Sequence, residues 1–143
     1  MKKLFIILAF ILIAQVNSGQ SSDPLIGKCM ASAGNDSKYL KDFRIQLGKA
    51  SESSGPRYKA NISLWKDMKY RFTMCSSDDS KGQLIVIVTD ETSKPVISSF
   101  DKKSGKTYTS VDFTCGKSGI YQINFDFIND EAGSGIGMIS IIK

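Results

Sequence analysis

Aspartate and glutamate side chains recur in the predicted turns of this 143-residue chain. Carboxylate oxygens that converge from several loops are the ligands that Ca²⁺ requires. If the strands between these turns run back and forth, alternate turns fall at one end of the fold, and the turns at residues 90–91 and Lys117 fall at the other. No acidic turn has the ligand spacing of an EF-hand, and aspartate is also an ordinary turn residue. Calcium is therefore the one cofactor that the sequence suggests, and its candidate ligands are Asp78, Asp79, Asp101, Asp130 and Glu131.

Two carboxylates that face each other across a cleft are also the catalytic groups of glycosidases. Such an enzyme needs an acid with a raised pKa and a cleft that holds the sugar, and a chain of this length has little surface to wall one. The sequence contains no histidine, so no Ser-His-Asp triad, Cys-His dyad or histidine-liganded zinc site can form within one chain. We therefore expect a protein that is not an enzyme, with a carboxylate-based glycan hydrolase as the less favoured alternative.

Three cysteines, Cys29, Cys75 and Cys115, allow one disulfide and one unpaired thiol in an oxidising compartment. Cys75 and Cys115 each end a predicted strand beside a turn, which makes them the favoured pair. Against this pairing, alternation places Cys115 with inward residues and Cys75 with outward ones, although a β-bulge could reconcile the two. A bridge from Cys29 to either partner stays open, as does a fully reduced chain. In each pairing the bridge would stabilise the fold rather than take part in catalysis.

The only tryptophan, Trp65, lies in a predicted turn rather than on the alternating face of a strand. An exposed aromatic ring on the face of a sheet can bind a sugar. Packing of Trp65 over the edge of the sandwich is the favoured interpretation, and ligand binding is the alternative. Trp65 is nevertheless the candidate ligand-binding residue.

Apolar and polar residues alternate along most of the chain, which is the period-two pattern of half-buried strands. Two alternating runs flank a short glycine-containing turn within residues 111–127 and predict a hairpin. The runs at residues 58–64 and 70–74 are separated so briefly that we expect them to be neighbours in a sheet. The continuous apolar run at residues 84–88 predicts a central strand that is covered on both faces.

About eight strands follow from these patterns, with further runs at residues 43–47, 96–100 and 136–142 and no helical periodicity between them. Many short strands with turn residues between them are typical of two packed antiparallel sheets. We predict an all-β protein that forms a single antiparallel β-sandwich of the jelly-roll type, with an up-and-down barrel as the runner-up.

Residues 1–18 have the organisation of a secretory signal peptide. Two lysines precede an unbroken apolar run at residues 4–14, which is short for a membrane span. After cleavage, residues 19–38 are expected to form a flexible N-terminus and residues 39–143 the sandwich. The sequence thus predicts a secreted or periplasmic protein with no integral membrane span after cleavage, and an uncleaved N-terminal anchor is the alternative.

The net charge gives little information about partners. Removal of the two leader lysines lowers the formal charge from +5 to +3, which solubility alone explains. The chain has no Lys/Arg-rich run and no nucleic-acid-binding motif, so nucleic acid is not an expected partner.

The start of the run at residues 118–125 (SGIYQINF) is a Gly-x-Tyr motif formed by Gly119 and Tyr121. Upstream, residues 69–72 are followed by an acidic turn and the apolar run at residues 84–88. This layout resembles that of secreted bacterial β-sandwich modules of the pre-peptidase C-terminal and GOLD-like types. The resemblance covers most of residues 58–143. It implies an accessory or binding role without catalysis, and some of these modules bind calcium. The chain departs from them in having no attached catalytic domain, which favours a free-standing exported protein.

These observations predict a small exported β-sandwich that binds an unknown protein or glycan ligand at the cell envelope. The alternative is a calcium-dependent adhesion or ligand-binding module.

Overall fold

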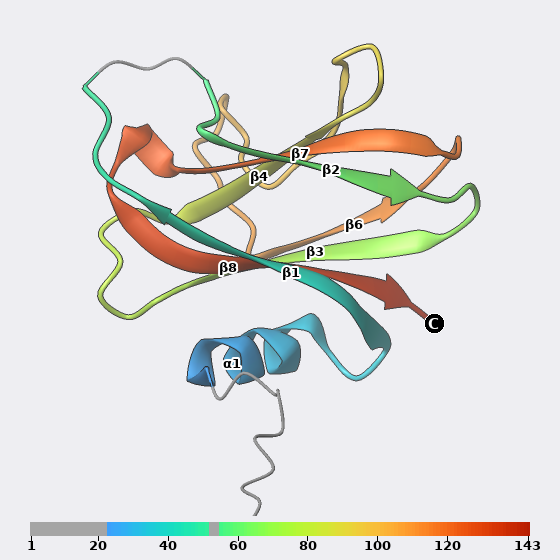
Figure 1. The fold of residues 1–143 in the computed structure, drawn as a ribbon, viewed down its shortest axis with the longest axis horizontal. Helices are drawn as coiled ribbons and strands as arrows, with labels where there is room; N and C mark the ends of the chain where they lie inside the picture. Colours follow the sequence, from blue (N-terminus) through green and yellow to red (C-terminus); the bar gives the residue numbers. More distant parts are fainter. Residues whose placement is uncertain (1–22, 52–54) are drawn as a thin grey trace, which may run out of the picture.

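Eight strands in two antiparallel, four-stranded sheets form the body of the protein (Figure 1). The computed structural model describes residues 23–51 and 55–143, so the predicted signal peptide at residues 1–18 lies outside the described residues. The strands are β1 (Ser37–Leu47), β2 (Tyr58–Leu64), β3 (Lys69–Ser76), β4 (Leu84–Thr89), β5 (Pro95–Ser98), β6 (Ser110–Thr114), β7 (Gly119–Phe127) and β8 (Gly133–Ile142).

The strand order is β1-β8-β3-β6 in one sheet, here called sheet A, and β2-β7-β4-β5 in the other, sheet B. Among these pairs, β4 and β5 alone are consecutive in the chain, because most connections cross from one sheet to the other. Eight antiparallel strands with these crossovers form a jelly roll. The prediction of an all-β, jelly-roll-like sandwich is therefore confirmed.

Two predicted strand pairings are wrong. The expected hairpin at residues 111–127 does not form, because β6 pairs with β3 in sheet A whereas β7 pairs with β2 and β4 in sheet B. The strands β2 and β3 likewise lie in different sheets. A hairpin and a crossover between facing sheets both turn the apolar side chains of successive strands toward one core, so alternation does not distinguish them.

Inward side chains of both sheets fill the space between the layers. Ile123 and Phe125 of β7 are at most 1% exposed, as are Phe72 of β3 and Ile139 of β8 from the opposite sheet. Gly137 of β8 belongs to this interior, because a Cβ atom at that position would overlap the ring of Phe125. The ring of Phe125 thus packs into space that the missing side chain of Gly137 leaves open.

The strand β4 lies between β7 and β5, which confirms its predicted central place in a sheet. Its predicted burial on both faces is wrong. Leu84, Val86 and Val88 point inward and are buried, whereas Ile85 and Ile87 alternate with them on the outer face and are half-buried. The continuous apolar run therefore reflects isoleucine on an uncovered face rather than a second covering layer.

A ten-residue helix, α1 (Pro24–Ala33), packs against β3 and β8 on the outer face of sheet A (Figure 1). Asp23 caps its N-terminus by accepting a hydrogen bond from the backbone N–H of Leu25 (2.9 Å), and proline occupies the first turn. Gly34 ends the helix with a φ of 88°, in the region that favours glycine. The expectation that residues 19–38 form a flexible terminus is therefore wrong for residues 24–33. Over the described part of the chain, no helix has the length and apolar character to cross a membrane.

The disulfide joins Cys29 of α1 to Cys75 of β3, with their Cα atoms 5.7 Å apart. Ile136 and Met138 of β8 complete a buried cluster around it, beneath the helix. Cys115 is an unpaired, buried thiol in the core between the sheets. The predicted Cys75–Cys115 pairing is wrong, because the two side chains lie on opposite faces of sheet A, as alternation indicated.

Arg71 of β3 joins the end of the helix to sheet A. Its guanidinium group binds both carboxylate oxygens of Asp112 on β6 (2.7 and 3.0 Å). The same group donates hydrogen bonds to the Ala33 carbonyl oxygen (2.7 Å) and to Asp36 (2.8 Å). One side chain thus satisfies a carbonyl at the helix C-terminus and ties β3 to its neighbour.

Candidate functional site

Three turns meet at one end of the sandwich. In the β2–β3 turn, the backbone N–H of Lys66 donates to Ser118 Oγ (2.7 Å) and that of Asp67 donates to the carbonyl oxygen of Cys115 (2.8 Å), both in the β6–β7 turn. The β6–β7 and β4–β5 turns line one pocket. The turn-end site defined here comprises Trp65, Asp90, Glu91, Thr92, Val96, Lys117, Ser118, Gly119, Ile120 and Tyr121.

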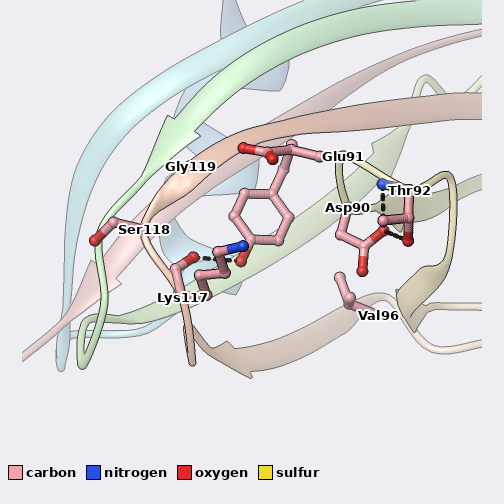
Figure 2. A pocket seen from close by; sticks show the side chains of 8 residues that line it. Asp90, Glu91, Thr92, Val96, Lys117, Ser118 and Gly119 are labelled. Atoms are coloured by element: carbon pink, nitrogen blue, oxygen red, sulfur yellow. Dashed lines mark hydrogen bonds between the residues drawn. The ribbon is translucent and has the colours of Figure 1, made fainter.

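The pocket at this site has a volume of about 120 Å³ and a largely apolar floor (Figure 2). Tyr121 and Val96 contribute apolar surface, while Glu91 and Lys117 bring opposite charges to the rim. Pockets that enclose a small molecule usually have volumes of about 300–1,000 Å³. This pocket is therefore suited to one group of a larger ligand that continues along the surface.

The Tyr121 hydroxyl is fixed at the base of the pocket. It donates a hydrogen bond to the Lys117 carbonyl oxygen (2.5 Å) and lies 3.6 Å from Cys115 Sγ. The interaction with Cys115, burial, and the negative charges of Asp90 and Glu91 together raise the pKa of Tyr121 to about 12. The phenol consequently stays protonated at neutral pH and does not act there as a base.

Asp90 shapes the β4–β5 turn. Its Oδ1 atom accepts hydrogen bonds from the hydroxyl of Thr92 (2.7 Å), the N–H of Thr92 (2.9 Å) and the N–H of Lys94 (3.0 Å). These bonds lower the pKa of Asp90, the one from the Thr92 hydroxyl most of all. Figure 2 shows the two bonds that join Asp90 and Thr92. The Asp90 carboxylate thus stabilises the conformation of the β4–β5 turn.

Glu91 and Lys117 are the exposed charges at the rim of the pocket. Glu91 lies over the strand that carries Gly119 (Figure 2), and a Cβ atom at Gly119 would come within 2.7 Å of its Oε1. The missing side chain at Gly119 therefore makes room for the carboxylate. Neither Glu91 nor Lys117 forms an ion pair with another residue in 23–51 or 55–143. Both groups remain available to hydrogen-bond a ligand.

Two large apolar side chains lie on the surface at this end. Trp65 is 67% exposed and Ile120 is 58% exposed, the two highest values among the large apolar residues that the structure describes. The backbone N–H of Trp65 donates to the Tyr70 hydroxyl (2.9 Å), which ties down the turn beneath the indole. Trp65, the ligand-binding candidate from the sequence, is therefore held at the backbone and open to solvent at its ring.

Three of the five candidate calcium ligands, Asp78, Asp101 and Glu131, have side-chain partners within the fold. Asp78 forms an exposed ion pair with Lys28 (3.4 Å), and Asp79 lies beside it in the same turn. Asp101 accepts hydrogen bonds within its own loop, from the N–H of Lys103 (3.0 Å) and the hydroxyl of Ser104 (3.0 Å).

Asp130 and Glu131 follow the end of β7, and Glu131 Oε1 accepts a hydrogen bond from the backbone N–H of Ala132 (3.0 Å). Their loop does meet the turn of Asp78 and Asp79, because the N–H of Gly82 donates to the Ala132 carbonyl oxygen (2.8 Å). Even so, within the described ranges no three His, Cys, Asp or Glu side chains are grouped closely enough to hold a metal ion.

A broader depression of about 340 Å³ lies near the β3–β4 turn, lined by Met74, Ser80 and Thr109 among others. The Ser80 hydroxyl there donates to the Gly82 carbonyl oxygen (2.7 Å) and accepts from the N–H of Ser134 (3.1 Å). The turn-end site is the stronger candidate, because it also presents two charged groups, Glu91 and Lys117, that have no ion pair within residues 23–51 and 55–143.

Sequence reasoning placed residues 90–91 and Lys117 at the same end of the fold, and the pocket confirms that placement. It did not identify Tyr121 or Ile120 as part of a site. The Gly-x-Tyr motif was the available signal for Tyr121, but the crossovers that place β7 beside β4 cannot be identified from the sequence. Comparisons with protein-family models and with curated proteins found no match for this chain.

Proposed function

We propose that the protein is an exported binding module without catalytic activity, and that it holds a cell-envelope ligand at the turn-end site. The observation that carries this proposal is Trp65, a large aromatic ring left open to solvent in a turn that is hydrogen-bonded to the β6–β7 turn, which lines a small apolar pocket. A protein that places an indole in water without a partner leaves apolar surface uncovered, and contact with a ligand removes that surface from water.

The chemistry of the site supports binding rather than catalysis. The Asp90 carboxylate is occupied by its own turn, and the Tyr121 phenol stays protonated at neutral pH. What remains at the surface is an aromatic ring, an apolar floor and two opposite charges. These groups provide stacking, apolar contact and hydrogen bonds, which are the elements of a recognition site.

Two observations support export. The apolar run at residues 4–14 has the composition of a signal peptide. The Cys29–Cys75 bridge lies buried beneath α1, and disulfides persist in oxidising compartments such as the periplasm and the extracellular space.

The experiment is co-sedimentation of the purified protein with isolated bacterial peptidoglycan sacculi and with outer-membrane vesicles. We expect saturable binding to one of these materials, and at least a ten-fold weaker affinity for Trp65→Ala. Tyr108→Ala is the matched control, because Tyr108 is also an exposed aromatic residue (45%) but lies outside the site. Tyr108→Ala should bind as the unaltered protein does. The proposal is wrong if neither material binds the protein, or if Trp65→Ala also binds as the unaltered protein does.

A further inference from the structure

The outer face of sheet B carries no helix among the described residues, whereas α1 covers part of the outer face of sheet A (Figure 1). Strand alternation defines its outward positions, because the core residues of β2, β4 and β7 point the other way. We call this surface the amide face, and its members are Lys59, Asn61, Ser63, Ile85, Ile87, Thr89, Ser98, Ile120, Gln122 and Asn124.

Hydrogen-bonding side chains form a row across the amide face. Asn61 of β2 lies opposite Gln122 of β7, which in turn lies opposite Thr89 of β4. Neighbouring strands are about 4.8 Å apart, so the row presents polar groups at regular intervals of about 5 Å. None of these three side chains forms a hydrogen bond with another residue in the described part of the chain. All three are therefore available to a ligand.

The adjacent row contains Asn124, which is already held in place. Its Nδ2 atom donates to the carbonyl oxygen of Ile87 (3.0 Å), and the side chain is 5% exposed. Ile87 lies directly opposite it on β4, and Ser98 of β5 lies beyond. Half-buried isoleucine thus alternates with amide and hydroxyl groups, which gives the face an amphipathic surface.

The amide face is close to electrically neutral. Asp126, the next outward residue of β7, is bound by Arg57 through Nε and Oδ1 (2.9 Å), so its charge is compensated. Lys59 is the remaining outward charge on β2, with no ion pair to any residue in 23–51 or 55–143. Acidic polysaccharides and anionic lipid surfaces are bound by clusters of several cations, which this face lacks. Its charge therefore matches a neutral ligand.

The arrangement of apolar groups also distinguishes a glycan from a protein partner. Protein interfaces place their large apolar residues at the centre and polar residues at the rim. Here the most exposed apolar residues, Trp65 and Ile120, lie at one end, while amide and hydroxyl groups alternate with half-buried isoleucine over the rest of the face. The side chains of residues 59, 61 and 63 point outward from β2, and Trp65 is the next position in this alternation. The amide face therefore continues into the turn-end site. An aromatic ring at the end of a row of amides suits a chain of sugars, which has apolar ring faces and hydroxyl edges.

We infer that the ligand is a neutral glycan chain that stacks on Trp65 and extends across the amide face, where Asn61, Gln122 and Thr89 hydrogen-bond its hydroxyl groups. This inference rests on the proposed function and specifies its ligand. Binding changes no covalent bond of the glycan.

The test uses the emission of Trp65, which is the only tryptophan and therefore reports on this end of the molecule alone. The probes are neutral cello-, chito-, malto-, laminari- and xylo-oligosaccharides, with polygalacturonate oligomers as the acidic comparison. We expect at least one neutral series to produce a saturable change in emission. The loss of one neutral hydrogen-bonding side chain should weaken binding about 3–10-fold, for Asn61→Ala and for Gln122→Ala alike.

Gln46→Ala is the matched control, because Gln46 is an exposed outward amide on β1 of the other sheet. Its affinity for the oligosaccharide should equal that of the unaltered protein, and thermal melts should show that all three variants fold. The inference is overturned if no neutral series binds, if the acidic oligomers bind more tightly, or if Asn61→Ala and Gln122→Ala leave affinity unchanged.

The outcomes separate the inference from the proposed function. If envelope binding depends on Trp65 but no neutral oligosaccharide binds, the proposed binding function stands and a neutral glycan is excluded as its ligand. Calorimetry measures oligosaccharide binding by variants that lack the tryptophan. If Gln122→Ala weakens binding but Trp65→Ala does not, the turn-end site is not the binding site. That result also overturns the inference, because the glycan then does not stack on Trp65.

Discussion

Removal of the disulfide between α1 and β3 should cost a large part of the stability of this fold. The bridge joins residues that are 46 positions apart. In the chain-entropy description, closing a loop of that length in the unfolded chain stabilises the folded state by about 4 kcal/mol. Domains of this kind have total stabilities of about 5–15 kcal/mol, so the double variant Cys29→Ala/Cys75→Ala should remain folded but marginally stable.

Thermal unfolding followed by circular dichroism measures this effect. At about 3–4 °C per kcal/mol for a domain of this size, the melting temperature should fall by roughly 12–16 °C. Reductant should produce a similar fall in the unaltered protein and none in the double variant. Cys115→Ala is the control: it should retain the reductant-sensitive fall, because Cys115 is the unpaired thiol.

Two results would refute this reasoning. One is a double variant that melts at the temperature of the unaltered protein. The other is a Cys115→Ala variant that no longer responds to reductant, since that would place Cys115 in the bridge. A peptide map of the unreduced protein gives an independent answer, because it should link the peptides that contain Cys29 and Cys75.

Two further predictions follow from contacts described above. Hydrogen bonds from Arg71 hold the pKa of Asp112 below its unfolded value of about 4. The stabilisation by Asp112 is therefore complete above that value and is lost as the pH falls through the lower folded pKa. Arg71→Gln should reduce the free energy of unfolding by about 1–2 kcal/mol at neutral pH, and stability should then fall less steeply as the pH is lowered. Urea unfolding at a series of pH values measures both effects. An unchanged dependence of stability on acid pH would contradict the role of the Arg71–Asp112 contact. Gly137→Ala should destabilise the protein by about 1–3 kcal/mol, because the added methyl group would overlap the ring of Phe125. Gly48→Ala is the control and should have little effect, because Gly48 has open space around it. Equal melting temperatures for the two variants would contradict the close packing of Gly137 against Phe125.

The sequence predicts the class of the fold because the inward positions of its strands are so regular. Ile123, Phe125 and Phe127 alternate with polar residues along β7, and all three are at most 1% exposed. Hydrophobic burial fixes which face of a strand is inward, and that information is local. The partner of each strand is set by contacts between distant residues, so the pairings of β2 with β7 and β3 with β8 could not be predicted in the same way.

The helix could have been predicted from its ends. Asp23, a proline in the first turn and Gly34 are the start and stop signals of a helix. Leu25, Ile26 and Cys29 lie on the face that packs against sheet A, but ten residues are too few for a strong apolar period. Recognition of α1 would also have corrected the disulfide, because the helix is what covers the outward side chain of Cys75.

The candidate site was only partly predictable. Trp65 stood out because a tryptophan in a turn departs from the pattern around it. The favoured expectation that its ring packs over the edge of the sandwich is wrong, because the side chain is exposed. The acidic turns stood out for their composition, yet the hydrogen bonds of Asp101 show an ordinary loop residue that caps its own turn. Composition therefore pointed to metal ligands where local geometry accounts for the carboxylate.

The first strand of the jelly roll is completed by the last. Ser37 at the start of β1 lies opposite Ile142 at the end of β8, and β8 separates β1 from β3. Strands β1 and β8 are separated by the other six strands of the sequence, so β8 must be synthesised before this layer can close, and such distant pairings form slowly. For a protein that we propose is exported, slow folding is useful, because an unfolded chain can pass through a translocation channel and then fold after it has crossed the membrane.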